Sequence, residues 1–316
     1  MRIIISTCFF LFLLSANGQP IVTAAGQLEV KGTKLYDAHN NTIVLRGMSF
    51  GWHNWWPRFY NKDAVHELVS KWNCTVIRAA MGIEPDSGYI KNRSRSIELV
   101  TNVIDACIKE NVYVIIDWHD HNIHQEEAVE FFSSMSKKYG ANPHVIYEIF
   151  NEPDHETWAE VKGYSEAVIK AIRANDPDNI ILVGSPHWSQ DVHLAAADPI
   201  KGYTNLMYTM HFYAGTHKKW LRDRAEEAIK KGLPIFISEC AGMEATGDGP
   251  LDHNEWKAFV HWMDEKGLSW IGWSVSDKKE TCSVLERSAP SRGNWKEEEI
   301  KEWGKLVRLF LRSYMK

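Results

Sequence analysis

The chain has 316 residues, a formal net charge of −5 and 14 Trp. Its length suits one closed α/β barrel, which takes typically ~250 residues plus insertions. The acidic balance and scattered lysines exclude the basic face of a nucleic-acid-binding protein, so we expect no nucleic-acid partner.

The N-terminal stretch has the organisation of a secretory signal. Met1-Arg2 precede an apolar run over residues 3–14, and small and polar residues follow at 15–18. Twelve apolar residues are too few to span a bilayer, and the order of charged, apolar and small residues is typical of a signal peptide. We predict a signal peptide at 1–18, although a cut after Ala25 also fits, and a secreted, extracellular domain at 19–316. No later segment approaches membrane-spanning length, so we expect no membrane partner.

Residues 27–46 alternate apolar and polar positions and predict a small N-terminal antiparallel β-ribbon. Eight apolar runs then alternate with polar-faced helical segments. The predicted strands cover residues 44–48, 75–79, 112–117, 145–149, 180–183, 206–210, 234–238 and 269–273. Predicted helices include 62–71, 95–110, 158–174, 222–231, 253–266 and 297–314.

Alternating strands and helices favour a parallel sheet with right-handed crossovers, and eight strands close a barrel. We therefore predict an α/β fold, a single-domain TIM (β/α)8 barrel. An open doubly wound sheet is the alternative architecture. It lacks support because no glycine-rich dinucleotide or phosphate loop follows the first strand.

Two predicted strands end on glutamates. The run at 145–149 leads into Asn151, Glu152 and Pro153, and the run at 234–238 leads into Glu239. Proline lacks a backbone donor, so the first strand should stop where the polar pair begins. Because the loops after the strands form the active face of a barrel, the two carboxyls should meet there. Paired carboxyls at this position are typical of a glycosidase.

Other strand ends supply side chains that suit this chemistry: Arg78, His119, His211, Tyr213 and Trp273. One carboxylic acid must protonate the leaving oxygen while one carboxylate meets the anomeric carbon. We expect a neighbouring negative charge to raise the pKa of the acid, and Arg78 and Tyr213 to stabilise the carboxylate form of Glu239. Asn151 is expected to donate to the sugar 2-hydroxyl. Carboxyls at the ends of strands four and seven should lie about 5–5.5 Å apart, as in a retaining enzyme.

Motifs of one family cover the mature chain nearly end to end. They are residues 45–49 (Leu-Arg-Gly-Met-Ser), 76–82 (Val-Ile-Arg-Ala-Ala-Met-Gly), 117–119 (Asp-Trp-His), 149–153 (Ile-Phe-Asn-Glu-Pro), 207–216, 238–239 (Ser-Glu) and 273–278. Together they resemble glycoside hydrolase family 5, specifically the cellulase-type endo-β-1,4-glucanases.

The resemblance implies a role for each candidate site residue. Glu152 would be the acid/base and Glu239 the nucleophile. The supporting side chains would be Arg78, His119, Asn151, His211 and Tyr213. The sugar contacts would be Trp55, Trp188, Trp273 and Lys278.

The resemblance also implies the substrate. It would be a β-1,4-linked glucan polysaccharide or oligosaccharide, cleaved at internal bonds with retention of configuration. A β-mannanase, a xyloglucanase or a mixed-linkage glucanase of the same mechanism is the alternative. We expect no cofactor, no metal ion and a monomer.

Four cysteines follow the predicted signal: Cys74, Cys107, Cys240 and Cys282. An even number favours disulfides in an oxidising compartment, but four cysteines permit three pairings. Because the loops after the seventh and eighth strands are neighbours around a barrel, we predict a disulfide between Cys240 and Cys282. Cys74 and Cys107 are predicted to be free.

Two other functions stay open at this stage. His119, His121 and His124 could belong to a metal-dependent barrel hydrolase, although no carbamylated-lysine candidate stands at the next strand ends. The chain could also be an inactive sugar-binding barrel, although it retains both glutamates. Loss of activity on chelation would favour the first alternative, and absence of hydrolysis by the folded protein would favour the second.

Overall fold

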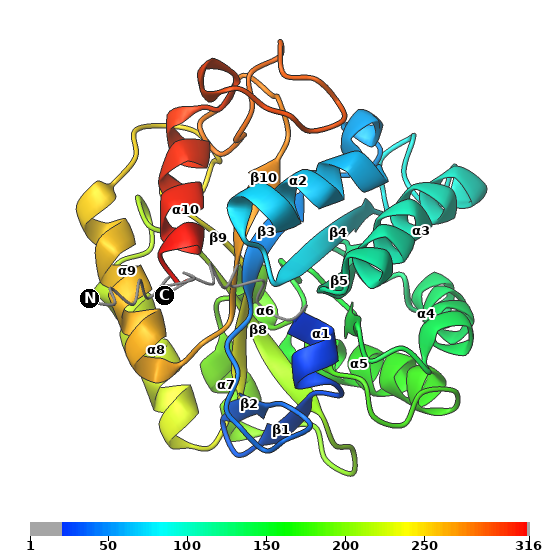
Figure 1. Ribbon diagram of the computed structural model, residues 1–316. Helices are drawn as coiled ribbons and strands as arrows, with labels where there is room; N and C mark the ends of the chain where they lie inside the picture. Colours follow the sequence, from blue (N-terminus) through cyan, green and yellow to red (C-terminus); the bar gives the residue numbers. More distant parts are fainter. Residues whose placement is uncertain (1–20, 315–316) are drawn as a thin grey trace, which may run out of the picture.

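The computed structural model describes residues 21–314 and is a closed barrel of parallel strands surrounded by helices (Figure 1). The strands follow one another around the barrel in the order β10-β3-β4-β5-β6-β7-β8-β9. This confirms the predicted TIM barrel. The barrel strands are β3 (Arg46–Phe50), β4 (Val76–Gly82), β5 (Tyr113–His119), β6 (Val145–Glu148), β7 (Ile181–Val183), β8 (Leu206–Tyr213), β9 (Ile235–Ala241) and β10 (Trp270–Val275). The predicted signal peptide, residues 1–18, lies outside the described residues.

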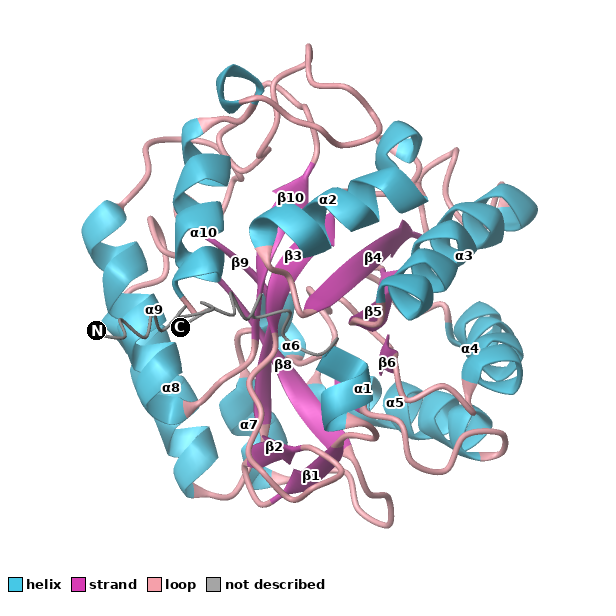
Figure 2. Cartoon of the chain, viewed as in Figure 1, coloured by secondary structure: helices cyan, strands magenta, loops and turns pink. Residues whose placement is uncertain are grey.

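Helices form the outer layer, as the cyan and magenta elements of Figure 2 show. They are α2 (Lys62–Trp72), α3 (Arg93–Glu110), α4 (Gln125–Tyr139), α5 (Trp158–Arg173), α6 (Pro186–Ser189), α7 (Val192–Ala197), α8 (Lys219–Lys230), α9 (His253–Lys266) and α10 (Glu302–Ser313). A 3-10 turn, η1 (Pro57–Phe59), precedes α2. The helix predicted at 297–314 is divided into η2 (Glu297–Glu299) and α10, because Ile300 is extended and bridges to Leu285.

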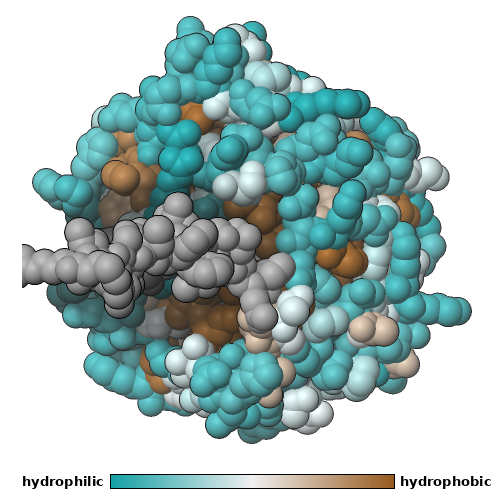
Figure 3. Space-filling view, in the orientation of Figure 1, coloured by the Kyte–Doolittle hydropathy of each residue, from teal (hydrophilic) through white to brown (hydrophobic). Residues whose placement is uncertain are grey.

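Each helix turns an apolar face to the barrel. In α2 the buried apolar side chains are Ala64, Val65, Leu68 and Trp72, which recur at helical spacing along one face. The outward faces are polar, and hydrophilic residues dominate the surface shown in Figure 3. Within residues 21–314, no helix has both the length and the apolar character needed to cross a membrane.

The amino end of the barrel is closed by the segment that precedes it. This segment contains α1 (Ile21–Ala25) and the antiparallel pair β1 (Glu29–Lys31) and β2 (Lys34–Tyr36), which confirms the predicted ribbon (Figure 1). Val22 and Leu35 share a buried cluster with Val76 and Tyr113, the first residues of β4 and β5. The N-terminal segment therefore seals one mouth of the barrel and leaves the other for chemistry.

The predicted disulfide between Cys240 and Cys282 is wrong, because every cysteine in the described part of the chain is a buried free thiol. The Cys240 thiol donates to the carbonyl of Ile271 at 3.3 Å. The Cys282 thiol donates to Glu280 at 3.3 Å. The backbone carbonyl of Cys282 accepts from the amide of Ser274, which lies three residues after Ile271 in β10. Neighbouring loops bring the two segments together, but the side chains turn to different partners, and a disulfide requires facing Cβ atoms.

Candidate active site

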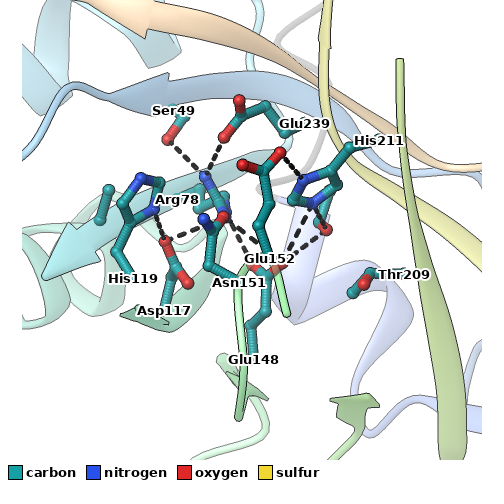
Figure 4. Close-up of polar contacts among 12 residues, drawn as sticks. Ser49, Arg78, Asp117, His119, Glu148, Asn151, Glu152, Thr209, His211 and Glu239 are labelled. Carbon is teal, nitrogen blue, oxygen red and sulfur yellow. Dashed lines mark hydrogen bonds and ion pairs between the residues drawn. The ribbon is translucent and has the colours of Figure 1, made fainter. Parts of the chain in front are cut away.

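The candidate catalytic residues meet at the carboxyl ends of the strands (Figure 4). Arg78 lies in β4, and Glu239 lies in β9. β6 ends at Glu148, so Asn151 and Glu152 stand in the loop just beyond it, before Pro153. The strand thus stops before the polar pair, as the proline predicted.

Arg78 is the fully buried centre of the site. Its Nε donates to Glu148 at 2.6 Å, and its Nη2 lies 2.9 Å from Asp117. Its Nη1 donates to Glu239 at 3.1 Å. A buried guanidinium is always charged, so these three carboxylates share one fixed positive partner. Glu148 and Asp117 were not identified from the sequence as site residues, although a carboxylate inside an apolar strand was a usable signal.

Two donors hold the Glu239 carboxylate. Tyr213 donates its phenol proton to Oε1 at 2.6 Å, while Arg78 binds Oε2. One oxygen each of Glu239 and Glu152 lie within 4.8 Å of each other, together with a ring nitrogen of His211. Oxygens this close fit a pair of carboxyls of the short class, which are about 5–5.5 Å apart.

The contacts of His211 fix a proton beside Glu152. Ser238 donates its single hydroxyl proton to Glu148 at 2.6 Å, and its Oγ lies 2.9 Å from His211 Nε2. Because that hydroxyl proton is already committed, Nε2 must carry a hydrogen and donate to Ser238. Nδ1 of the same ring lies 2.9 Å from Glu152 Oε1. One further proton then lies between Nδ1 and Glu152, on either the ring or the carboxyl.

In the free protein the pKa of Glu152 is lowered and the pKa of Glu239 is raised, which is the reverse of the expectation from the sequence. Burial opposes it, but hydrogen bonds from His121 and His211 lower the pKa of Glu152 to about 2. Burial likewise opposes the hydrogen bonds to Glu148 and Glu152 that raise the pKa of His211 to about 9. Burial and the charge of Glu152 raise the pKa of Glu239. The expectation did not include the hydrogen bonds of His121 and His211 to Glu152, which place the shared proton of the pair on His211 until a substrate is present.

Asn151 and His119 complete the polar lining. The Asn151 Oδ1 accepts from Arg78 at 2.6 Å, while its buried Nδ2 has no hydrogen-bond partner among residues 21–314. A buried amide donor left without a partner is costly, which suits a donor that a sugar hydroxyl satisfies. His119 bonds to Asp117 at 2.7 Å, and burial together with Arg78 holds its pKa well below the usual range. It is therefore neutral.

The predicted sugar contacts line the open side of the site. Trp55 is 53% exposed and stacks on Trp52, with ring centroids 4.6 Å apart. Trp273 is only 7% exposed, because one face of its ring lies parallel to His119 at 5.1 Å. Lys278 lines the same cavity as Trp55 and Trp273 and pairs with Glu280 at 2.5 Å. Trp52 was not identified from the sequence as a contact.

Trp188 lines a second cavity that also reaches Glu152. Trp220 lines this cavity as well, and nothing in the sequence pattern marked it. It lies in the first turn of α8, which begins at Lys219, before the predicted start of that helix at residue 222.

The histidines of the metal alternative do not gather into one cluster. His119 bonds to Asp117, and His121 lies 3.4 Å from Glu152. His124 bonds to Asp120 at 2.8 Å, and Asp120 also accepts from the Trp118 indole at 3.1 Å. Asp120 thus organises the loop after β5. Among residues 21–314 the groupings with metal-ligand spacing are Glu84, Asp120 and His124, and Glu152, His211 and Glu239.

Comparison with known proteins identifies the family. Residues 36–279 match the family model described as cellulase (glycosyl hydrolase family 5). The chain is 41% identical over 290 residues to an endoglucanase of Clostridium saccharobutylicum, and 37% identical over 319 residues to Endoglucanase Z of Dickeya dadantii. These alignments cover 90% and 99% of this chain, but only 64% and 72% of those relatives.

Solved structures agree. A protein of Cytophaga hutchinsonii superposes with a TM-score of 0.92 and 42% identity, covering 93% of this chain and 97% of that one. The catalytic domain of Thermobifida fusca endoglucanase Cel5A, in complex with cellotetraose, gives a TM-score of 0.87 and 31% identity, covering 92% and 99%. The chain therefore belongs to glycosyl hydrolase family 5, the cellulase family.

Proposed function

We propose that this protein is a secreted endo-β-1,4-glucanase that hydrolyses internal bonds of its substrate by double displacement, with retention of configuration. The observation that carries the proposal is the short separation of the Glu152 and Glu239 carboxyls at the carboxyl end of the barrel. That spacing leaves no room for a water between a carboxylate and the anomeric carbon. The relatives named endoglucanase, and the cellotetraose complex of the Thermobifida enzyme, support β-1,4-glucan as the substrate class.

In the first step, Glu239 attacks the anomeric carbon and forms a glycosyl ester. The proton shared by Glu152 and His211 passes through Glu152 to the leaving oxygen as the glycosidic bond breaks. Arg78 and Tyr213 hold the Glu239 carboxylate in place for the attack. The Asn151 Nδ2 donates to the 2-hydroxyl, a contact that strengthens in the transition state.

In the second step, Glu152 accepts a proton from water, and that water attacks the anomeric carbon. The ester bond to Glu239 breaks, and the product keeps the β configuration. His211 can return the accepted proton to the shared position, since its pKa of about 9 keeps it a proton carrier across neutral pH. Glu239 thus acts as the nucleophile, and Glu152 acts first as the acid and then as the base.

Early-time proton NMR of cello-oligosaccharide hydrolysis tests the mechanism. The β-anomer should form first and mutarotate later, and Glu239→Gln should abolish turnover. Formation of the α-anomer first would show an inverting enzyme and refute the assigned roles. Product analysis on carboxymethylcellulose, lichenan, mannan, xyloglucan and xylan should show the fastest cleavage on the β-1,4-glucan. A faster reaction on mannan or xyloglucan would support those alternatives.

The proposal of secretion rests on residues 1–18, which have the order of a signal peptide. Expression of the whole chain in a secreting host should release activity to the medium, with a new N-terminus near residue 19. A matched chain starting at residue 19 should keep its activity inside the cells. Retention of both chains inside the cells would contradict the assignment.

A further inference from the structure

Two cavities meet at Glu152. The larger, of about 560 Å³, is lined by Trp188 and Trp220, which are 45% and 43% exposed. The smaller, of about 270 Å³, is lined by Trp55 and by Glu239. Glu152 lines both, whereas Glu239 lines only the smaller one.

If the proposed function holds, this difference between the two cavities shows which side of the cleft holds the attacked sugar and which side holds the leaving group. The sugars attached to the attacked carbon must lie on the side of Glu239, in the smaller cavity. The leaving group takes its proton from Glu152, so it extends into the larger cavity. Trp188 and Trp220 therefore stand on the leaving-group side of the bond.

One buried carboxylate links the two segments that carry these indoles. Asp191 binds the imidazole of His187, the residue before Trp188, and also binds the guanidinium of Arg224. The Arg224 guanidinium lies over the Trp220 ring, with Cζ 4.9 Å from the ring centroid. The segment after β7 and helix α8 are thus joined through Asp191, and both indoles remain exposed.

The backbone that presents Trp188 is strained. His187, Trp188 and Ser189 all adopt left-handed φ angles, +53°, +55° and +55°, where non-glycine residues are uncommon. The Trp188 amide donates to the carbonyl of Pro153 at 2.9 Å, next to Glu152. Such conformations persist where surrounding contacts over-determine them, and they cluster at ligand-binding sites.

We infer that Trp220 is a sugar-binding residue on the leaving-group side of the cleft, forming with Trp188 a pair of platforms for successive rings of a β-1,4-glucan. An indole face combines apolar burial with a quadrupole that suits the axial C–H bonds of a sugar. The pair favours binding modes with two or more sugar units beyond the cleaved bond. This inference rests on the proposed function and adds a specificity determinant to it.

The test is the pattern of bonds cleaved in cellopentaose in ¹⁸O-labelled water, read by mass spectrometry. Trp220→Ala should lower the ratio of events with two or more leaving-side sugars to events with one, by about threefold to tenfold for one lost stacking contact. Trp220→Phe, which keeps a platform, should restore most of the ratio. Trp55→Ala, on the other side of Glu152, should shift the ratio in the opposite direction. Leu309→Ala, at a 66% exposed site on α10, is the control and should not change it.

The outcomes separate the inference from the proposed function. If the parent enzyme does not cleave cellopentaose, the proposed function fails, and the inference fails with it. If the parent cleaves it and Trp55→Ala shifts the pattern, but Trp220→Ala does not, the inference is overturned while the proposed function stands. A shift with Trp220→Ala in the same direction as with Trp55→Ala would refute the direction assigned to the cleft.

Discussion

Glu148→Gln tests whether a shared proton on His211 supplies the acid. Glu148 is fully buried, accepts from Ser238, and has Oε1 3.5 Å from His211 Nε2. The amide oxygen of a glutamine can still accept from Ser238, but its NH2 group then faces the Arg78 Nε–H, which loses its acceptor. The variant therefore removes the charge beside His211 together with one hydrogen bond of Arg78, and the pH profile is the readout that reports the charge.

The expected direction follows from the sign of the interaction. His211 keeps its proton up to about pH 9, in part because Glu148 is negative. Removing that charge lowers the pKa of His211, so the pair with Glu152 loses its shared proton at a lower pH. The alkaline limb of the kcat/KM profile should move to lower pH, and the acidic limb should move less.

The separation of the charges sets the size of the shift. At 3.5 Å and an effective dielectric constant of about 20, two unit charges interact by about 5 kcal/mol, equivalent to about 3.5 pH units. Arg78 offsets part of the Glu148 charge through its 2.6 Å contact, so the net effect on His211 is smaller. We expect the alkaline limb to move by about 1 to 2 pH units.

The assay is kcat/KM on an aryl β-cellobioside across pH, with circular dichroism and thermal unfolding as checks of folding. The control is Asp176→Asn, another buried carboxylate, which accepts from Tyr147 at 2.7 Å outside the site. The control should lower Tm and leave the alkaline limb in place. An unmoved alkaline limb in folded Glu148→Gln would refute the shared-proton reasoning.

Further predictions concern other parts of the molecule. Glu152→Ala should spare substrates with activated leaving groups and regain rate with azide, whereas absence of rescue would contradict the acid/base role. Arg78→Met should lower the free energy of unfolding by roughly 3–5 kcal/mol, measured by urea denaturation, since three carboxylates lose their buried partner. Non-reducing peptide mapping should find no bridge between Cys240 and Cys282. Treatment with EDTA should leave activity unchanged, and a loss restored by a metal ion would support the metal alternative.

The barrel was predictable because its strands are continuous apolar runs of β-forming residues, each followed by a polar residue at the carboxyl end. Burial on both faces dictates such runs, and closure of eight parallel strands places their ends together. Glu152 and Glu239 could therefore be brought together from the sequence alone. Their proximity also followed, since strands four and seven have fixed positions around the barrel.

Side-chain direction was less predictable. Adjacent loops suggested a bond between Cys240 and Cys282, but adjacency does not fix where a thiol points. Trp220 was missed because α8 begins before the predicted residue 222, and because the sequence does not reveal the Arg224 contact with its ring. Glu148 was overlooked because a lone carboxylate inside an apolar strand, although a usable signal, does not identify which buried group it binds.

The partners of the two glutamates distinguish their roles where sequence position does not. Both stand near the carboxyl ends of strands, and one oxygen of each lies within 4.8 Å of the other. Glu239 receives donors that stay protonated at neutral pH, an arginine and a phenol, which hold it as an anion ready to attack. Glu152 faces the His211 imidazole, a group that can give and take a proton, whereas a guanidinium stays charged. Glu239, with its fixed donors, is therefore suited to covalent attack. Glu152, paired with a titratable group, is suited to the proton transfers, which occur twice in each turnover.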